Sequence, residues 1–413
     1  MGPHRPPSPS EEGEGEAAGG GPPHRIRPVK TRDKRGAAPR RALRAAGLTL
    51  LAAAGAATFA LARSTGWLVS LGARPEGARL DRIRRSPHWS DGRFHNPIPT
   101  DMLKASDVPE TLWRQLGASA ARYPRRPIPV VARAAADYAA PPASGLRVTW
   151  IGHATALVEI DGHRFLTDPM WSERSSPSSL LGPRRFFEPP IALSDLPALD
   201  AVLISHDHYD HLDMQSVQAL GRRGTPFLVP LGVGAHLEKW GVAPAQIREL
   251  DWEESAAFGD LTVVATPARH FSGRGITGRD ATLWCSWVVA GPRHRVFYSG
   301  DSGYFDGYRA IGAAHGPFDA ALMSLGSYGP TWPHVHMDPE ELVRAHAELG
   351  GGLLVPVHWA TFNLAFHAWN EPAERAEVAA AREGVRIAFP RPGEMLEPSA
   401  PPPAPSGDWW RQP

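Results

Sequence analysis

Short apolar runs separated by turn residues dominate the chain from residue 146 onward. RVTWI, TALVEI and HRFLTDP predict strands, and Asp161-Gly162 between the last two indicates a hairpin turn. AVLIS at 201–205 is typical of a buried strand. Further runs of strand type follow at PFLVP, LTVVATP, TLWCSWVVA, RVFYSG, AALMSL and LLVPVH.

Helical patterns lie between these strands, at 213–221, 338–349 and 371–383. Asp338 is expected to cap the second helix with Pro339 at its first position, and Gly384 is expected to end the third. Strands and helices thus alternate over roughly 250 residues, which predicts an α/β domain with helices packed on sheet.

The segments outside this pattern differ in composition. The chain holds 41 Gly and 43 Pro among 413 residues, so part of its length is not packed core. Residues 1–40 predict a disordered tail whose end is basic, and the Pro-interrupted stretch 79–145 predicts an irregular, partly packed lead-in. Residues 399–413 form a Pro-rich tail, in which we interpret Trp409 and Trp410 as incidental.

An apolar segment, residues 45–62, has no charged or amide side chain and approaches the ~20 residues of a membrane-spanning helix. It fits a membrane anchor, a cleaved export signal or an Ala-rich helix of the folded domain. The preceding basic run favours the first two, because Lys and Arg stay on the cytoplasmic side. Arg40-Arg41 resembles a twin-arginine signal, and Ala60-Leu61-Ala62 offers a cleavage site.

We therefore assign 41–72 to an anchor or export signal and 79–398 to a catalytic domain. This assignment predicts membrane association through 45–62, with the catalytic domain outside the cytoplasm, or export after cleavage of the signal. Amino-terminal sequencing of the mature protein separates the two alternatives.

Charge and cysteine content exclude several classes of function. The 44 basic and 43 acidic residues give a formal charge of +1, which argues against a general nucleic-acid binder. The single cysteine, Cys285, excludes an intrachain disulfide framework and a cysteine-cluster metal site. Its place within TLWCSWVV predicts a small buried apolar residue.

The sequence SHDHYDH at 205–211 follows the predicted strand AVLIS and concentrates metal-ligand residue types. In an extended segment His206 and His208 project to one side, and the turn that follows presents Asp210 and His211 to a second position nearby. Imidazole and carboxylate are the ligands that zinc takes when thiolate is absent. This spacing therefore predicts a site for two metal ions.

Three further candidates each follow a predicted strand: His270, Asp301 and His358. Because strand ends meet at one edge of an α/β fold, these side chains are expected to complete the site. A carboxylate such as Asp301 is suited to bridging two cations ~3.5–4 Å apart.

SHDHYDH, TPARHF, YSGDSGY and PVHW, in that order, resemble the metallo-β-lactamase superfamily. WIGHATALVEIDGHRFLTDP, GPFDAALMSLGSYGP and HMDPEELVRAH resemble its N-acylphosphatidylethanolamine-hydrolysing phospholipase D branch. The likeness extends over about residues 80–395. It implies a four-layer αββα sandwich with two zinc ions at one edge.

The resemblance also implies roles for single residues. Asp210 and Asp301 would act at the catalytic centre, and Asp168 in LTDP would support the metal loop without binding metal. His336 matches a family histidine near the substrate, although a surface histidine at a helix start is its alternative. His153 in WIGHAT is interpreted as a structural turn residue. One zinc would be held by His206, His208 and His270, and the other by Asp210, His211 and His358, with Asp301 bridging.

The branch implies hydrolysis of N-acylphosphatidylethanolamine to a fatty-acid ethanolamide and phosphatidic acid. His208 stands where a Glu would suggest di-iron redox chemistry, which favours zinc hydrolysis. A zinc hydrolase of another bond, such as a sugar-phosphate lactone, is the first alternative, and a non-enzymatic membrane-tethered binding protein is the second. We expect a phospholipid or other small-molecule ester as partner and no nucleic acid.

Overall fold

We describe the protein from a computed structural model, which defines residues 67–100, 109, 120–275, 277–399 and 408–411. The predicted tail 1–40 and the apolar segment 45–62 lie outside these residues. Among the helices in the described ranges, none has both the length and the apolar character needed to cross a bilayer.

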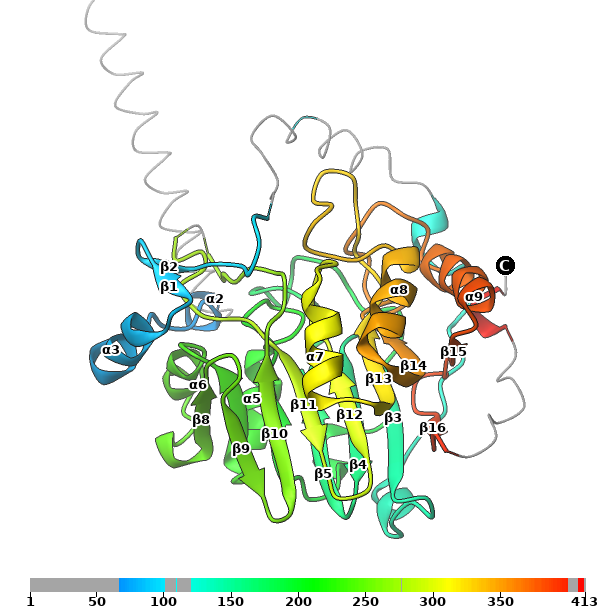
Figure 1. Ribbon diagram of the computed structural model, residues 1–413, viewed down its shortest axis with the longest axis horizontal. Helices are drawn as coiled ribbons and strands as arrows, with labels where there is room; N and C mark the ends of the chain where they lie inside the picture. The colour runs from blue at the N-terminus through cyan, green and yellow to red at the C-terminus, as the bar shows by residue number, and fades with distance from the viewer. Residues whose placement is uncertain (1–66, 101–108, 110–119, 276, 400–407, 412–413) are drawn as a thin grey trace, which may run out of the picture. The chain divides into compact units, whose positions relative to one another are not determined.

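Two seven-stranded mixed sheets form the centre of the fold (Figure 1). The first has the order β16-β3-β4-β5-β6-β7-β8, antiparallel as far as β5 and parallel beyond it. The predicted hairpin is present, because Ile160 pairs with His163 across a turn in which Asp161 and Gly162 both have positive φ. The strands are β3 (Leu146–Gly152), β4 (Thr155–Ile160), β5 (His163–Thr167), β6 (Ala201–Leu203), β7 (Phe227–Pro230), β8 (Ile247–Leu250) and β16 (Met395–Leu396).

The second sheet repeats this plan with the order β9-β10-β11-β12-β13-β14-β15, antiparallel as far as β12 and then parallel. Cys285 lies just before β11 and is buried, as expected. The strands are β9 (Ser255–Phe258), β10 (Leu261–Thr266), β11 (Ser286–Ala290), β12 (Arg295–Tyr298), β13 (Phe318–Ser324), β14 (Gly351–Val357) and β15 (Arg386–Ile387).

Helices cover the outer face of each sheet. Apolar side chains of both sheets share one buried cluster, which includes Val148, Phe165, Trp287 and Phe297. A second cluster lies between the first sheet and the helices α5 (Met214–Arg222) and α6 (Gly234–Lys239). Helices α7 (Gly307–His315), α8 (Pro339–Leu349) and α9 (Glu371–Glu383) lie along the second sheet (Figure 1). The result is the four-layer αββα sandwich that the sequence predicted.

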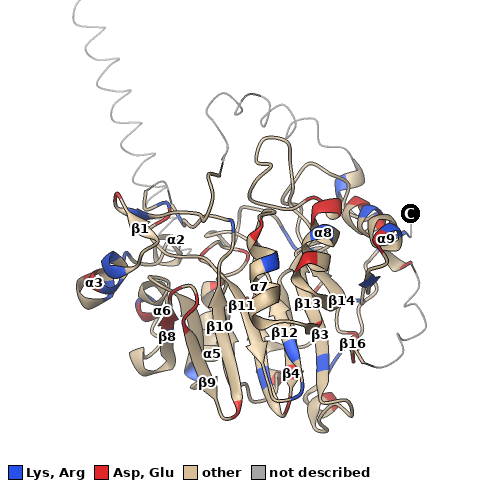
Figure 2. Cartoon of the chain, viewed as in Figure 1, with Lys and Arg blue, Asp and Glu red and all other residues tan. Residues whose placement is uncertain are grey.

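The helix boundaries follow local chemistry. The Asp338 side chain accepts a hydrogen bond from the Glu341 N–H, Pro339 is the first residue of α8, and Gly384 ends α9 with φ 67°. Helices α6 and α7 had no clear pattern, because α6 spans only six residues and α7 contains Gly307 and Gly312. Charged residues concentrate on helices and loops, while the strands are mostly uncharged (Figure 2).

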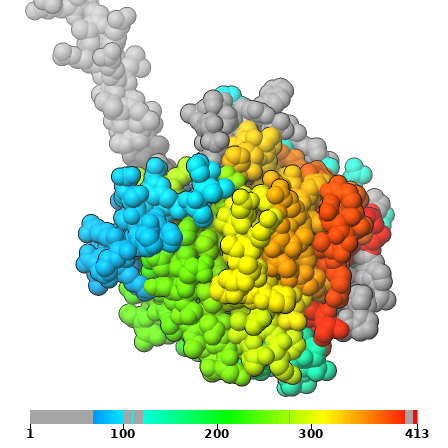
Figure 3. Space-filling view, in the orientation of Figure 1, coloured from blue at the N-terminus to red at the C-terminus, as the bar shows by residue number. Residues whose placement is uncertain are grey.

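The segment from residue 67 to 100 packs on the first sheet's side of the domain and carries α2 (Trp67–Ser70), α3 (Gly77–Arg85), β1 (Trp89–Ser90) and β2 (Arg93–Phe94). Arg79 on α3 pairs with Glu238 at 2.6 Å and with Glu249 at 2.8 Å. The space-filling view places this segment, in blue, against the green part of the chain (Figure 3).

The carboxyl-terminal tryptophans correct an interpretation made from the sequence. Trp409 and Trp410 are only 2% and 5% exposed, although the flanking sequence is Pro-rich. Trp409 donates to the Phe389 carbonyl at 2.9 Å and lies 5.2 Å from the Trp359 ring. They are part of the core and not incidental. The sequence lacked a periodic pattern around them, so only the tertiary contacts reveal this role.

Candidate metal centre

The candidate site lies where six strands end at one edge of the two sheets. The alternation of strand directions places the carboxyl ends of β3, β5 and β6 on one edge of the first sheet. The same reasoning aligns the ends of β10, β12 and β14 in the second sheet. The residues that follow these strands are His153, Asp168, His206 to His211, His270, Asp301 and His358.

His206, His208 and His270 form the first group of metal-type donors. Nε2 of His206 lies 2.8 Å from Nδ1 of His208, which lies 3.2 Å from Nε2 of His270. Three nitrogens bound tetrahedrally to one zinc ion stand roughly 3.3 Å apart, given Zn–N bonds of ~2.0 Å. His206 and His270 are buried and His208 is partly exposed, and the three nitrogens converge without a carboxylate among them. The donor set therefore fits one zinc ion.

Asp210, His211 and His358 form the second predicted group. Oδ2 of Asp210 lies 3.2 Å from Nε2 of His358 and 3.4 Å from Nε2 of His211. Nε2 of His211 is buried without a hydrogen bond of good geometry, which is the state of a nitrogen arranged to bind a metal. This group also fits one ion.

Asp301 lies between the two groups, as a bridging carboxylate requires. Its Oδ2 is 3.1 Å from Nε2 of both His211 and His358 and 3.9 Å from Nε2 of His270. Its Oδ1 accepts a hydrogen bond from the Ser324 hydroxyl at 3.0 Å. Oδ2 is thus directed at both groups, while Oδ1 is held by the end of β13.

The structure assigns His153 a place that the sequence interpretation missed. His153 does occupy a turn, with φ 51°, between β3 and β4. Its Nε2 lies 2.8 Å from Asp210 Oδ2, and its ring is 4.1 Å from that of His358. It therefore belongs to the second donor group as well. The available signal was the strand pairing, because the end of β3 must lie at the same edge as the end of β5.

Asp168 supports the metal-type residues through hydrogen bonds, as its match to the family motif implied. It is inaccessible, and its Oδ1 accepts from the Ser205 N–H at 2.7 Å. Oδ2 accepts from Nδ1 of His211 at 2.7 Å and from the Ser205 and Tyr298 hydroxyls. This network fixes the His211 tautomer, with Nδ1 protonated and Nε2 free for a metal.

The turn that carries the HDHYDH sequence is held from outside by Arg274. Its guanidinium donates to the carbonyls of Asp207 and Leu212, at 2.6 and 3.0 Å, and lies 4.0 Å from the Tyr209 ring centre. Asp207 points away from the donor groups and accepts from the Gly273 N–H at 2.7 Å. The two non-ligand positions of the turn therefore anchor it to the 272–282 loop.

Burial and neighbouring charges shift the pKa values of the donor residues in opposite directions. Burial lowers the pKa of His206 and His270 well below the usual histidine value. Burial alone would also lower the pKa of His211, but Asp301 and Asp210 raise it well above that value. Burial alone would raise the pKa of Asp301, whereas His211 and His358 hold it well below the usual range. Both carboxylates are thus charged at neutral pH.

His336 lies beside the donor groups, and its predicted role near the substrate stays a prediction. Its Nδ1 is 3.9 Å from Asp301 Oδ2, and its ring is 5.2 Å from that of His270. Burial lowers its pKa to about 4, so it is a neutral imidazole at neutral pH. It is able to donate one hydrogen bond, but it is not charged.

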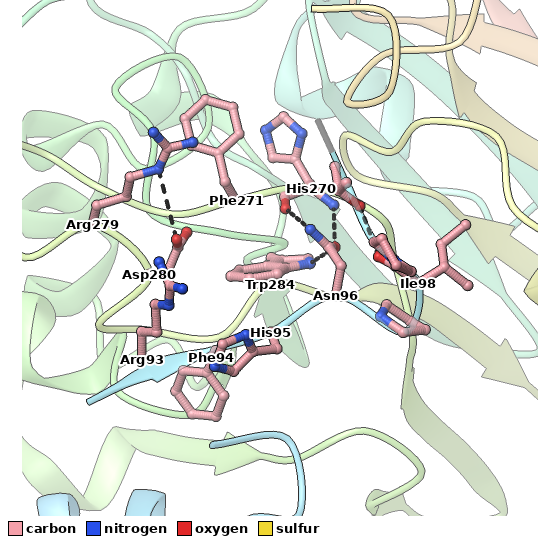
Figure 4. A pocket seen from close by; sticks show the side chains of 13 residues that line it. Arg93, Phe94, His95, Asn96, Ile98, His270, Phe271, Arg279, Asp280 and Trp284 are labelled. Carbon is pink, nitrogen blue, oxygen red and sulfur yellow. Dashed lines mark hydrogen bonds and ion pairs between the residues drawn. The ribbon is translucent and has the colours of Figure 1, made fainter. Parts of the chain in front are cut away.

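Asn96, which has no recognisable motif in the sequence, forms two hydrogen bonds to the backbone of His270. Its Nδ2 donates to the His270 carbonyl at 2.7 Å, and its Oδ1 accepts from the His270 N–H at 2.9 Å. Trp284 Nε1 donates to the same Oδ1 at 3.2 Å. Figure 4 shows these bonds joining the segment just after β2 to the loop that carries His270. The Asn96 side chain thus satisfies both backbone polar groups of His270, as a neighbouring strand would, and fixes the position of this metal-type residue.

We expect Asn96→Ala to lower metal affinity about tenfold, because His270 loses two bonds that fix its position. The measurement is competition for zinc with a chromogenic chelator. Thr100→Ala is the matched control, since Thr100 lies on the same segment and accepts only from Arg269 Nε, at 3.1 Å. Equal zinc affinity in both variants would refute a positioning role for Asn96.

Known protein families and relatives resemble this chain. A model described as a beta-lactamase superfamily domain matches residues 163–359. An uncharacterised protein of Mycobacterium tuberculosis is 49% identical over 378 residues, which are 90% of this chain and 99% of that protein. The N-acyl-phosphatidylethanolamine-hydrolyzing phospholipase D 1 of Caenorhabditis elegans is 36% identical over 257 residues, 59% of this chain and 72% of that protein.

A solved structure also resembles the fold. It is described as a possible metal-dependent hydrolase from Veillonella parvula, with a TM-score of 0.50 and 18% identity, and covers 60% of this chain and 98% of that one. At this identity the likeness concerns the fold alone.

Proposed function

The chain is a metal-dependent hydrolase of the metallo-β-lactamase superfamily, and on that premise we propose that it is a binuclear zinc phosphodiesterase of phospholipase D type. The proposed substrates are N-acylphosphatidylethanolamine-like lipids, cleaved to a fatty-acid ethanolamide and phosphatidic acid. The observation that carries the proposal is the placement of Asp301 Oδ2 within 3.9 Å of nitrogens from both donor groups.

Two zinc ions, when bound, would supply hydroxide at neutral pH and polarise a phosphoryl oxygen. The residues of the chain hold this arrangement in place. Asp210 and Asp301 offset positive charge in a buried site, and Asp168 keeps His211 in one tautomer. His336, as a neutral imidazole, would donate a hydrogen bond to a phosphate oxygen and so orient the phosphodiester.

An exposed apolar patch supports a lipid substrate. Six of the ten large apolar side chains that are exposed in the described chain lie on two neighbouring segments. The Ser70 hydroxyl joins these segments through a 3.1 Å bond to the Pro177 carbonyl. We call this set the apolar rim; it consists of Trp67, Leu68, Val69, Leu71, Leu180 and Leu181.

A cavity of about 760 Å³ is lined both by residues of the apolar rim and by the turn that carries the HDHYDH sequence. Trp67, Leu68 and Leu71 contribute from the rim, and Tyr209, which separates His208 from Asp210, contributes from the turn. Clustered apolar groups of this kind are characteristic of surfaces that meet a membrane or another molecule. The rim also follows directly on the segment 45–62 along the chain, which fits the proposed membrane association.

We expect the double variant Leu180→Ser, Leu181→Ser to bind lipid vesicles about tenfold more weakly, because these side chains are 59% and 71% exposed and would enter the bilayer interface. Vesicle sedimentation measures the effect, with melting temperature as the check on folding. The control is Val378→Ser, a 68% exposed apolar position on α9. Unchanged vesicle binding would rule out the rim as a lipid contact.

A direct test compares initial rates on N-palmitoylphosphatidylethanolamine and on a panel of lactones, with and without chelator. We expect release of palmitoylethanolamide and phosphatidic acid, measured by lipid mass spectrometry, and loss of this activity when metal is removed. Hydrolysis of lactones without cleavage of the lipid would favour the alternative function, a lactone hydrolase. Purified protein that neither contains nor binds metal would overturn both the phosphodiesterase and the lactone hydrolase.

A further inference from the structure

A cavity of about 520 Å³ opens directly beside His270 and is separate from the apolar rim. One wall is the segment Arg93–Thr100, and the other is the loop Phe271–Trp284 (Figure 4). The two hydrogen bonds between Asn96 and the His270 backbone fix the first wall to the loop at one end of the cavity. The Phe94 N–H, which donates to the Asp280 carbonyl at 2.8 Å, fixes it at the other. The cavity is therefore a built feature of the fold.

The charge of this cavity is positive. Arg93 and Arg279 line it together with one carboxylate, Asp280. Nε of Arg279 lies 3.6 Å from Asp280 Oδ2, and its side chain is 51% exposed. Among the described residues, no carboxylate lies within ion-pair distance of Arg93. Burial raises the pKa of Asp280, which weakens it as a partner for the two cations.

Arg279 lies close to the candidate metal centre. The Arg279 guanidinium lies 5.3 Å from the centre of the Phe271 ring. That ring lies 4.4 Å from the His208 ring and 4.7 Å from the His270 ring. One aromatic ring therefore separates the guanidinium from two proposed zinc ligands, so a substrate held at the metal centre would extend into this cavity within a few bonds.

We propose that this cavity binds an anionic group on the leaving-group side of the substrate, a carboxylate held by Arg279 and Arg93. The guanidinium fork matches a carboxylate with two parallel hydrogen bonds. The inference rests on the proposed function, because it places the phosphodiester at the metal centre. A fatty-acid ethanolamide leaving group is uncharged and would form no ion pair with the two arginines. An N-acylserine leaving group carries a carboxylate beside its amide and would form one.

The reaction is an ordinary hydrolysis. The oxygen of water forms a bond to phosphorus, and the bond from phosphorus to the serine oxygen breaks. The departing oxygen takes up a proton, which gives an N-acylserine and phosphatidic acid. No oxidant, reductant or second substrate is needed.

The first experiment compares kcat/KM for N-palmitoylphosphatidylserine and N-palmitoylphosphatidylethanolamine in phosphatidylcholine micelles, with the zinc-loaded full chain. We expect wild-type protein to favour the serine lipid, and the double variant Arg93→Gln, Arg279→Gln to lower that ratio about tenfold. Arg84→Gln, an exposed arginine on α3 whose side chain is 62% exposed, should keep the wild-type ratio. A ratio unaffected by the double variant overturns the proposal.

A second arm separates the substrate from the surrounding lipid. Anionic phosphatidylglycerol is added to micelles of the ethanolamine lipid, and the rates of wild-type and double-variant protein are compared. If the double variant loses only the response to phosphatidylglycerol, the arginines contact the lipid surface and the proposed subsite is wrong.

A third arm does not depend on phosphodiesterase activity. Calorimetry measures the binding of soluble N-hexanoylserine and N-hexanoylethanolamine to zinc-loaded protein. We expect tighter binding of the serine compound, lost in the double variant but kept in Arg84→Gln. Equal binding of both compounds to wild-type protein overturns the subsite, whereas a serine preference without lipid hydrolysis overturns only the proposed function.

Discussion

Replacing Asp301 by asparagine is expected to lower hydrolytic activity about a thousandfold while leaving the fold intact. The amide keeps the size of the side chain and an oxygen for the Ser324 hydroxyl, which is 3.0 Å away. It removes the negative charge that faces His211, His358 and His270. Two cations held close together would then repel each other without a bridging anion. We expect zinc content to fall from two ions toward one per chain.

Elemental analysis and initial rates measure this prediction on the same preparations. Asp306→Asn is the matched control, because Asp306 is an exposed carboxylate just before α7. It should keep wild-type zinc content and rate. An Asp301→Asn protein with full zinc content and full activity would disprove the bridging role.

Replacing Asp168 by alanine is expected to destabilise the protein by about 3–5 kcal/mol, the cost of breaking a buried charged network. The substitution leaves the Ser205 N–H, the Ser205 and Tyr298 hydroxyls and Nδ1 of His211 without their buried acceptor. It also frees the His211 ring to rotate. Zinc affinity should therefore fall by about 10–100-fold. Denaturant unfolding of the metal-free protein and chelator competition measure the two effects separately.

Asp161→Ala separates stability from metal binding. Asp161 is likewise a buried acceptor with positive φ, and it holds the Arg293 and His294 backbone N–H groups at 3.0 and 3.1 Å. It lies in the β4–β5 hairpin turn, at the end of the strands opposite to the metal centre. This variant should lose stability and keep zinc affinity. If both variants lose zinc affinity equally, Asp168 acts only through general stability.

Local sequence was sufficient for most of the fold. The Asp161-Gly162 pair fixed one hairpin, because both positions need positive φ. The cap of α8 at Asp338 and the end of α9 at Gly384 were recognised for similar reasons. In contrast, β8 and β9 had no distinct pattern, because each has four residues and is only partly buried. Their strand character depends on pairing with β7 and β10.

The candidate site divides in the same way. The spacing of His206, His208, Asp210 and His211 shows its chemistry within six residues, so the sequence alone predicts it. His270, Asp301 and His358 were found because each follows a recognisable strand. His153 and Asn96 were not, because a single histidine in a turn and a single asparagine in a loop have no local signature. Asn96 contacts His270 across 174 positions of sequence.

The sequence by itself determined an α/β domain with helices packed on sheet, the chemistry of the metal-type residues and the resemblance to a family that implies two sheets, because strand patterns, caps and the SHDHYDH motif are local. Only the tertiary structure decided that His153 joins the second donor group, that Asn96 holds the backbone of His270, that Trp409 and Trp410 complete the core, and that Arg93 and Arg279 line one cavity. Each of these depends on segments distant in sequence, which come together only when the two sheets pack face to face and align their strand ends.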